Sequence, residues 1–269
     1  MSTPFLLMNR RPSGGFGNQL FQYNFLFQFA HMHGVEFLHR GFPQLGCFEL
    51  QKESKIRSLL LGMNSFSISL ETIYEMKWQQ TCDEVQQFFQ EGRSVIVMPG
   101  ILGEYYKEVT IIDPKFIFRS NERKISVQNE NVLAVHYRGK DFHEWNSRAV
   151  MSLEFYSKGV QKALKNNSKL NRIRIFTDDR ESETVTRLVD FFGAEISDGS
   201  EEEDFKEMMR TQTIVASPST FAFWSAVLGD CQEIYYSRDW LHYASETGHK
   251  FWRDLREGSL PFFPTVLEV

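Results

Sequence analysis

The second half of the sequence repeats one pattern, in which a short apolar segment precedes a longer segment with helical spacing. The apolar segments occupy residues 132–136, 172–176, 213–216 and 233–236. Helical spacing follows at 152–164, 181–192 and 220–228. Connections of this length join parallel strands, because antiparallel neighbours need only a short turn. The pattern predicts a doubly wound α/β domain, with a parallel sheet covered by helices on both faces.

The first half opens in the same way and is less regular afterwards. An apolar strand at 4–8 precedes the glycine-rich stretch Gly14–Gly17, and helical spacing runs from Asn18 to about His33. Another apolar strand occupies 94–98, and a polar, charged segment at 120–131 separates the two halves. We therefore expect two α/β domains, residues 1–122 and residues 123–269.

Composition excludes several classes of protein. The net charge is -5 and no long basic run occurs, which argues against a nucleic-acid partner. Cys47, Cys82 and Cys231 are far apart and form no CxxC pair, which favours a reducing compartment and argues against a zinc site. We find no signal peptide and no apolar stretch near the ~20 residues of a membrane span. The expected location is the cytoplasm, with peripheral attachment to the inner face of the membrane as an alternative.

Unusual residues gather where ligands bind in such sheets, beyond the carboxyl ends of the strands. They follow three apolar segments, at 136–141, 177–179 and 217–221. The glycine-rich stretch follows the first strand of the other half. Glycines let backbone N–H groups approach an anion, and a helix start adds partial positive charge. This stretch fits either an anion-binding site or a plain strand-to-helix turn. The candidate residues are Gly15, Phe16, Gly17, Asn18 and Gln19.

Arg138 and Asp141 lie directly after the strand that ends at His136. The guanidinium fork can bind two phosphate oxygens. Asp141 could accept a proton from a hydroxyl group or orient Arg138; a surface salt bridge is the alternative for this pair. His136 fits a satisfied core imidazole better than a ligand-binding group.

Two further segments have polar candidates. Asp178 and Asp179 are adjacent, without DxD spacing, so a helix cap is preferred to a metal site. Hydrogen bonds from a guanine edge or a ribose are a third interpretation. Ser217, Ser219 and Thr220 precede a helix, where their hydroxyls and the free N–H groups could form a second anion-binding site as well as an N-cap. Phe221 follows them and is expected to pack against the fold.

Taken in order, these segments resemble the signatures of the bacterial α-1,2-fucosyltransferase family and its relatives among GDP-fucose transferases. Residues 14–23 resemble its GGxGNQxFQY signature, and 136–141 resemble HxRRxD. Residues 176–179 resemble FSDD, and 219–224 resemble STFSWW. Two positions depart from the family pattern: Gly139 replaces the second Arg, and Phe223 replaces the first Trp.

The resemblance implies a GT-B-type fold, with two Rossmann-like halves facing across a cleft. It implies an inverting, metal-independent enzyme with no cofactor, which moves fucose from GDP-fucose to a hydroxyl group, such as the galactose 2-OH of an oligosaccharide or glycolipid. There are two alternatives: a transferase that uses another GDP-sugar, and an inactive homologue that binds a nucleotide sugar or a glycan. The expected catalytic residues are Arg138 and Asp141. The expected donor site comprises Gly15, Phe16, Gly17, Asn18, Gln19, His136, Arg138, Asp178, Asp179, Ser217, Ser219, Thr220 and Phe221.

Overall fold

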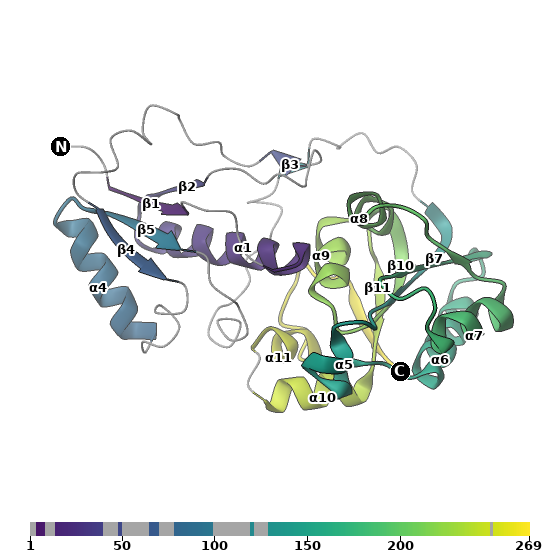
Figure 1. Ribbon diagram of the computed structural model, residues 1–269. Helices are drawn as coiled ribbons and strands as arrows, with labels where there is room; N and C mark the ends of the chain where they lie inside the picture. The colour runs from purple at the N-terminus through teal and green to yellow at the C-terminus, as the bar shows by residue number, and fades with distance from the viewer. Residues whose placement is uncertain are drawn as a thin grey trace. The chain divides into compact units, whose positions relative to one another are not determined.

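The computed structural model describes residues 4–8, 14–39, 48–49, 65–69, 78–98, 119–120, 129–247 and 250–269. The chain divides into two compact units, Met1–Asn121 and Glu122–Val269 (Figure 1). Each unit contains a parallel β-sheet with helices.

The first unit has a four-stranded sheet in the order β2-β1-β5-β4, in which every pair is parallel. Its strands are β1 (Phe5–Met8), β2 (Glu36–His39), β4 (Ser65–Ser69) and β5 (Ser94–Met98). The helices are α1 (Phe16–Met32) and α4 (Trp78–Gln90), and β3 (Phe48–Glu49) pairs with β6 (Arg119–Ser120). The strands predicted at 4–8 and 94–98 are confirmed, whereas α1 begins two residues before Asn18.

The predicted apolar spacing of α1 is realised as burial on most sides of the helix. Leu20, Phe21, Phe25 and Phe29 are all buried. A helix that is apolar over much of its circumference is stable only when it is enclosed by the protein. The strand order places β1 between β2 and β5, so β1 is a central strand of this sheet. The glycine-rich stretch follows β1 in the sequence.

The second unit has a six-stranded, wholly parallel sheet in the order β12-β11-β10-β7-β8-β9. Its strands are β7 (Asn129–Tyr137), β8 (Arg172–Thr177), β9 (Glu195–Ile196), β10 (Thr211–Ala216), β11 (Glu233–Tyr236) and β12 (Thr265–Glu268). The prediction of a parallel sheet from the strand–helix alternation is confirmed.

The helical segments of this unit are α5 (Phe142–Trp145), the 3₁₀ turn η3 (Ser147–Ala149), α6 (Leu153–Asn166), α7 (Glu183–Phe192), α8 (Glu201–Met209), α9 (Thr220–Leu228), α10 (Arg238–Glu246) and α11 (Lys250–Arg256). Helices α6 and α7 cover one face of the sheet, and α8 and α9 cover the other (Figure 1). Right-handed crossovers produce this arrangement when the chain runs first toward one edge and then toward the other.

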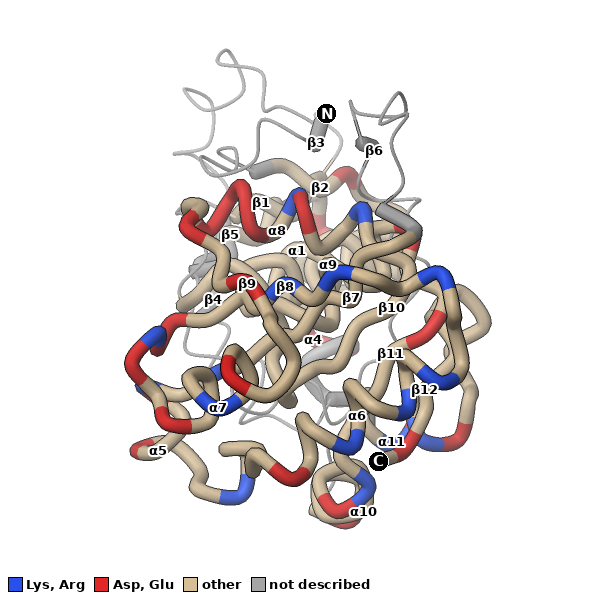
Figure 2. The backbone as a smooth tube through the Cα atoms, turned by 90° about the vertical axis from the view of Figure 1, so that its right-hand side faces the viewer, with Lys and Arg blue, Asp and Glu red and all other residues tan. Residues whose placement is uncertain are grey.

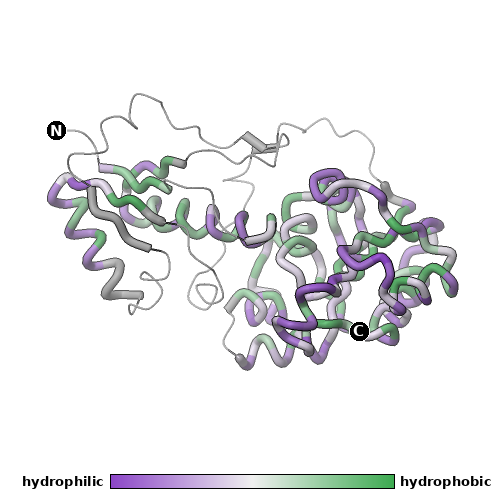
Figure 3. The backbone as a smooth tube through the Cα atoms, in the orientation of Figure 1, coloured by the Kyte–Doolittle hydropathy of each residue, from purple (hydrophilic) through white to green (hydrophobic). Residues whose placement is uncertain are grey.

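Local sequence explains how several of these helices begin. The Ser152 side chain caps α6 by accepting a hydrogen bond from the Phe155 N–H. Ser200 and Glu203 form a capping box at the acidic start of α8. Figure 3 shows hydrophobic and hydrophilic residues alternating along helices such as α6, α7 and α10, the pattern of helices with one face against the protein, whereas α9 is buried over most of its length.

Charges of both signs are interspersed over the helices and loops of the second unit (Figure 2). Within the described residues, no helix combines the length and the apolar character needed to cross a lipid bilayer.

Candidate functional site

In the second unit, the direction in which successive strands are added to the sheet changes beside β7, the first strand of the sheet in the sequence. From β7 the chain proceeds to β8 and β9 on one side, and β10, β11 and β12 lie on the other side. The loops that leave β7 and β10 therefore lead to helices on opposite faces of the sheet. Such a switch point opens a crevice at the carboxyl ends of the two strands, where ligands bind in doubly wound folds.

His136 and Ser217 join the two loops that leave this switch point. His136 Nδ1 and Ser217 Oγ are 2.7 Å apart, and the Ser217 N–H donates to the His136 carbonyl at 3.0 Å. The imidazole also stacks on Phe221, with ring centroids 5.6 Å apart. Burial, together with the charge of Arg138, lowers the pKa of His136 from 6.5 to about 3. His136 is therefore a neutral, buried imidazole with a partner, as expected for a core histidine.

Arg138 extends from the end of β7 and is held by two carboxylates. Its Nε and Nη2 donate to the two carboxylate oxygens of Asp141, both at 2.9 Å. Nε also lies 3.1 Å from Asp178 Oδ2. The Nη1 group takes no part in these contacts. The two carboxylates fix the plane of the guanidinium and leave one edge of the fork available for an anion.

The charges of this group are stable at neutral pH. Burial lowers the pKa of Arg138, but the hydrogen bond with Asp141 and the nearby charge of Asp178 outweigh it, so the pKa lies above the ordinary value. The hydrogen bond from Arg138 lowers the pKa of Asp141. A carboxylate whose pKa is lowered is a weaker proton acceptor. The geometry therefore favours an orienting role for Asp141 over proton abstraction.

The prediction that the adjacent acids cap a helix is wrong. Helix α7 begins at Glu183, and its N-cap position is Ser182. Asp178 instead accepts a hydrogen bond from the Gly139 N–H at 3.0 Å while contacting Arg138. Asp178 thus connects the loops that follow β7 and β8. These loops are close together because the carboxyl ends of neighbouring parallel strands lie side by side. The sequence shows both loops but not this pairing.

Gly139 packs closely against Asp179 and the Tyr137 ring. A Cβ atom at Gly139 would lie 2.8 Å from Asp179 Oδ2 and 2.8 Å from Tyr137 Cε1. The Tyr137 hydroxyl accepts a hydrogen bond from Ser182 Oγ at 2.9 Å, which restrains the ring. Glycine at this position lets the loop carrying Arg138 lie against the segment that follows β8.

The start of α9 lies on the other side of the switch point. The side chain of Ser219, the N-cap residue, accepts a hydrogen bond from the Phe221 N–H, and Thr220 begins the helix. The first turn of α9 contains no acidic residue, whereas α6, α7, α8 and α10 each carry at least one. The partial positive charge of this helix start is thus not neutralised by its own side chains. The arrangement suits a bound anion.

The candidate residues at 15–19 belong to the first unit. Gly15 is the N-cap residue of α1, and Phe16, Gly17, Asn18 and Gln19 form its first turns. Gly14 has φ of 81°, in the left-handed region that favours glycine. Gln19 Nε2 donates to the Gly14 carbonyl at 2.7 Å, which ties the helix start to the preceding turn. The first turn of α1 has no acidic residue, so it is also a helix start suited to an anion.

Two tyrosines support the second-unit site and were not predicted. The Tyr156 hydroxyl, from α6, donates to the His136 carbonyl at 3.2 Å, and its ring packs against Tyr137. Sequence spacing offers no signal for these contacts, since aromatic residues are frequent throughout the chain. Among the described residues, His, Cys, Asp and Glu side chains do not gather in groups of three or more that could hold a metal ion.

Replacing His136 should change how stability depends on pH. The pKa of His136 is about 3 in the folded chain and 6.5 in the unfolded chain. As the pH falls, the imidazole is therefore protonated in the unfolded chain before it is protonated in the folded chain. The contribution of neutral His136 to stability is complete above pH 6.5 and declines as the pH falls toward 3. We expect His136→Gln to reduce the slope of unfolding free energy below pH 6.5 by up to about 1.4 kcal/mol per pH unit. Urea unfolding at several pH values measures this slope, and an unchanged slope would contradict the prediction.

Comparison with known proteins identifies the fold. No protein-family model and no curated protein matches the sequence. Solved structures do match. POFUT1 in complex with GDP-fucose has 11% identity and a TM-score of 0.56, over 86% of this chain and 96% of that chain. The fucosyltransferase NodZ from Bradyrhizobium has 15% identity and a TM-score of 0.50, over 85% of this chain and 94% of that chain.

The shared fold covers both units, not the second unit alone. The neighbours are GT-B fucosyltransferases, and the chain has the two parallel-sheet halves that this architecture requires. The predicted α/β, GT-B-type fold with Rossmann-like halves is confirmed. The predicted cleft concerns how the halves face each other and stays a prediction.

Proposed function

We propose that this chain is a fucosyltransferase that moves fucose from GDP-fucose to a hydroxyl group of a glycan, with the 2-OH of galactose as the first candidate acceptor. The observation that carries the proposal is the held guanidinium of Arg138 at the β7–β10 switch point, beside the loop that starts α9. POFUT1 and the NodZ α-1,6-fucosyltransferase share the fold and were solved with GDP-fucose. The four sequence signatures point to the same donor.

The chemistry needs positive charge near the leaving group. As the bond between the sugar and the β-phosphate breaks, its electron pair stays on the phosphate oxygen of GDP, and negative charge accumulates there. In our proposal the Nη1 edge of Arg138 meets that charge, and the start of α9 at Ser219 and Thr220 adds partial positive charge. The acceptor oxygen attacks the anomeric carbon from the opposite side, which inverts its configuration, and the hydroxyl proton passes to solvent water as the new bond forms.

The remaining candidates have supporting roles in this proposal. Asp141 positions Arg138 and does not take the proton of the acceptor hydroxyl. Asp178 holds the loop of Arg138 rather than a guanine edge. We assign donor binding to the second unit and the reacting hydroxyl of the acceptor to the first, and no metal ion takes part. The second-unit residues proposed to form or support the donor site are His136, Arg138, Asp178, Asp179, Ser217, Ser219, Thr220 and Phe221. The start of α1, with Gly15, Phe16, Gly17, Asn18 and Gln19, stays a separate candidate anion-binding site of the first unit.

One observation favours a second candidate function. Gly139 occupies the position where the resembled family has a second Arg, and its close packing leaves no room for a side chain without movement of the loop. A site with one fewer cation neutralises the leaving diphosphate less well. The chain could then bind a nucleotide sugar or a glycan without transferring it. Transfer of another GDP-sugar is the other alternative.

A transfer assay separates these functions. Labelled GDP-fucose and labelled GDP-mannose are each incubated with the chain and with lactose as a galactose-terminated acceptor. We expect fucose transfer with multiple turnovers, much slower transfer of mannose, and the same rates in EDTA. Binding of GDP without turnover would establish the binding-protein alternative. Loss of transfer in EDTA, restored by a divalent cation, would overturn the metal-free mechanism.

A further inference from the structure

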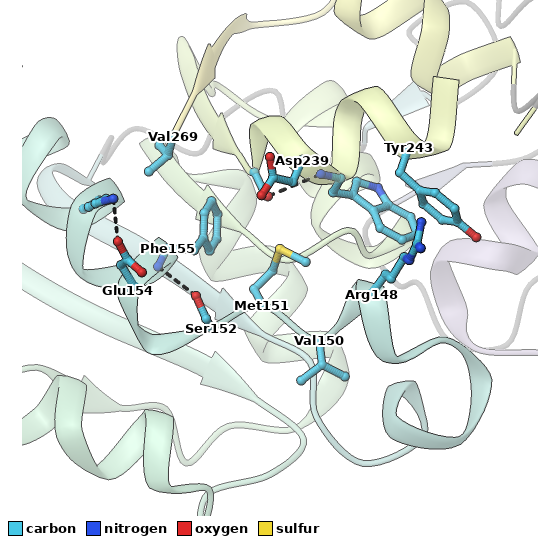
Figure 4. Close-up of a pocket in the computed structure, with 12 residues that line it drawn as sticks. Arg148, Val150, Met151, Ser152, Glu154, Phe155, Asp239, Tyr243 and Val269 are labelled. Carbon is cyan, nitrogen blue, oxygen red and sulfur yellow. Dashed lines mark hydrogen bonds and ion pairs between the residues drawn. The ribbon is translucent and has the colours of Figure 1, made fainter. Parts of the chain in front are cut away.

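A cavity lies at the carboxyl edge of the same sheet, beyond β11 and β12. Its volume is about 510 Å³, within the range of roughly 300–1,000 Å³ typical of small-ligand sites. It is lined by η3 and the segment after it, by the first turns of α6 and α10, and by Val269 (Figure 4). Neither Arg138 nor Ser219 is among its lining residues, so it is distinct from the site described above.

Apolar and polar side chains line this cavity in similar measure. Met151, Phe155 and Trp240 are buried and contribute to its wall. Ser152 and Ser237 are N-cap residues whose oxygens accept backbone N–H groups. Each hydroxyl proton is therefore still available for donation to a ligand, because the oxygen acts as acceptor in its cap. A wall that combines apolar side chains with hydroxyl and charged groups suits a ligand that has both C–H surface and hydroxyl groups.

The charged side chains of the cavity balance. Arg148 and Lys158 are opposed by Glu154 and Asp239. Lys158 and Glu154 form an ion pair at 2.6 Å, and the two acids lie in the first turns of α6 and α10. These acids compensate the partial positive charge of both helix starts. The cavity therefore disfavours a phosphate or a second nucleotide, and suits a neutral ligand with several hydroxyl groups.

Aromatic contacts connect this cavity to the candidate donor site. Arg148 lies over the Tyr243 ring, 4.7 Å from its centroid. The Trp240 ring is 6.3 Å from that of Trp145, which is 60% exposed and 5.1 Å from Phe142. Arg138 in turn lies over the Phe142 ring at 5.8 Å. An exposed tryptophan thus stands between the cavity and the proposed reaction centre, and aromatic rings with both an apolar face and a polar edge are suited to wet, polar ligands.

We propose that the cavity between η3, α6 and α10 is a saccharide subsite that holds a part of the glycan acceptor remote from the reacting hydroxyl. Its role as an acceptor subsite rests on the proposed function; saccharide binding itself does not. A sugar ring has apolar C–H faces for Phe155 and Trp240 and hydroxyl groups for Arg148 and Asp239. Figure 4 shows Phe155 and Asp239 bordering the same space from α6 and α10.

Saturation-transfer NMR with neutral disaccharides tests this subsite. The probes are lactose, N-acetyllactosamine and N,N′-diacetylchitobiose, each titrated through the millimolar range, with inorganic phosphate as the anionic competitor. We expect saturation transfer to at least one disaccharide and no competition by phosphate. Arg148→Ala and Asp239→Asn should each raise its Kd by about tenfold, the usual effect of losing a hydrogen bond to a charged group. Arg187→Ala, which removes an exposed arginine on α7, is the matched control and should leave Kd unchanged.

The outcomes separate the subsite from the proposed function. GDP binding, measured by calorimetry, should be the same in Arg148→Ala as in the unmodified chain, which also verifies folding. A disaccharide Kd that rises in Arg148→Ala and Asp239→Asn supports the subsite, whether or not GDP binding and transfer are detected. Absence of both GDP binding and transfer would overturn only the proposed function. Absence of saturation transfer to all three disaccharides, an unchanged Kd in Arg148→Ala, or displacement by phosphate would overturn the subsite.

Discussion

Replacing Arg138 by alanine is expected to reduce kcat/KM for fucose transfer by about 10²–10³-fold, the effect typical of removing one donor that stabilises developing charge. The guanidinium is held by Asp141 and Asp178, and its Nη1 edge takes no part in those contacts. Removing the side chain deletes the proposed contact with the leaving diphosphate without opening a core cavity, because Arg138 is partly exposed. Initial-rate kinetics with labelled GDP-fucose measure the loss.

Two further variants distinguish the role of this side chain from a loss of charge. Arg187→Ala removes an arginine whose contact is an exposed pair with Glu183, and it should retain full activity. Arg138→Lys keeps the charge but loses the planar fork that the two carboxylates orient, so it should recover only part of the rate. Near-full activity in Arg138→Ala, with an unchanged urea midpoint, would contradict the assignment.

Gly139→Ala is expected to reduce both stability and catalysis, although the residue has no side chain to contribute. The added Cβ would lie 2.8 Å from both Asp179 Oδ2 and the Tyr137 ring, and Ser182 restrains that ring. Overpacking of this kind typically costs about 1–3 kcal/mol. Because the Gly139 N–H donates to Asp178, a shift of the loop also moves Arg138. We expect kcat to fall by about tenfold or more, since small displacements of a catalytic group have effects of this size.

A double-mutant cycle tests whether the loss of activity acts through the guanidinium. Combined with Arg138→Ala, the Gly139→Ala change should lower kcat very little further, while its effect on the urea midpoint persists. Coupling between neighbouring residues is what such a cycle measures. Additive losses of activity would show instead that the glycine acts on the reaction independently of Arg138.

The strands and helices with strong patterns were predictable from sequence. Strands β1, β5 and β11 and helix α9 match their predicted bounds to within one residue. Their signals are local, because continuous apolar runs and helical spacing are set by neighbouring residues. Strand β12 and helices α10 and α11 were not predicted. The four residues TVLE of β12 become a strand through pairing with β11, which lies about 30 residues earlier in the chain.

The candidate site was predictable in position but not in its contacts. The sequence placed polar residues after β7, β8 and β10, and the rule for ligands at carboxyl edges gathers them there. It did not show that Asp178 reaches back to Gly139 and Arg138, nor that Tyr156 supports His136. The cavity lined by Arg148 and Trp240 was also not predicted, since its lining comes from three separate segments of the chain.

The sequence by itself determined the alternation of strands and helices, the parallel sheets and the order of the loops that form the site. Hydrophobic periodicity and helix capping act between residues that are close in the chain. Only the tertiary structure decided which side chains meet across those loops. That choice depends on strand order and register, which bring β7 and β10 side by side although they are separated by more than 70 residues. The contact of Arg138 with Asp178 likewise depends on the pairing of β7 with β8, whereas its contact with Asp141, three residues on, is local.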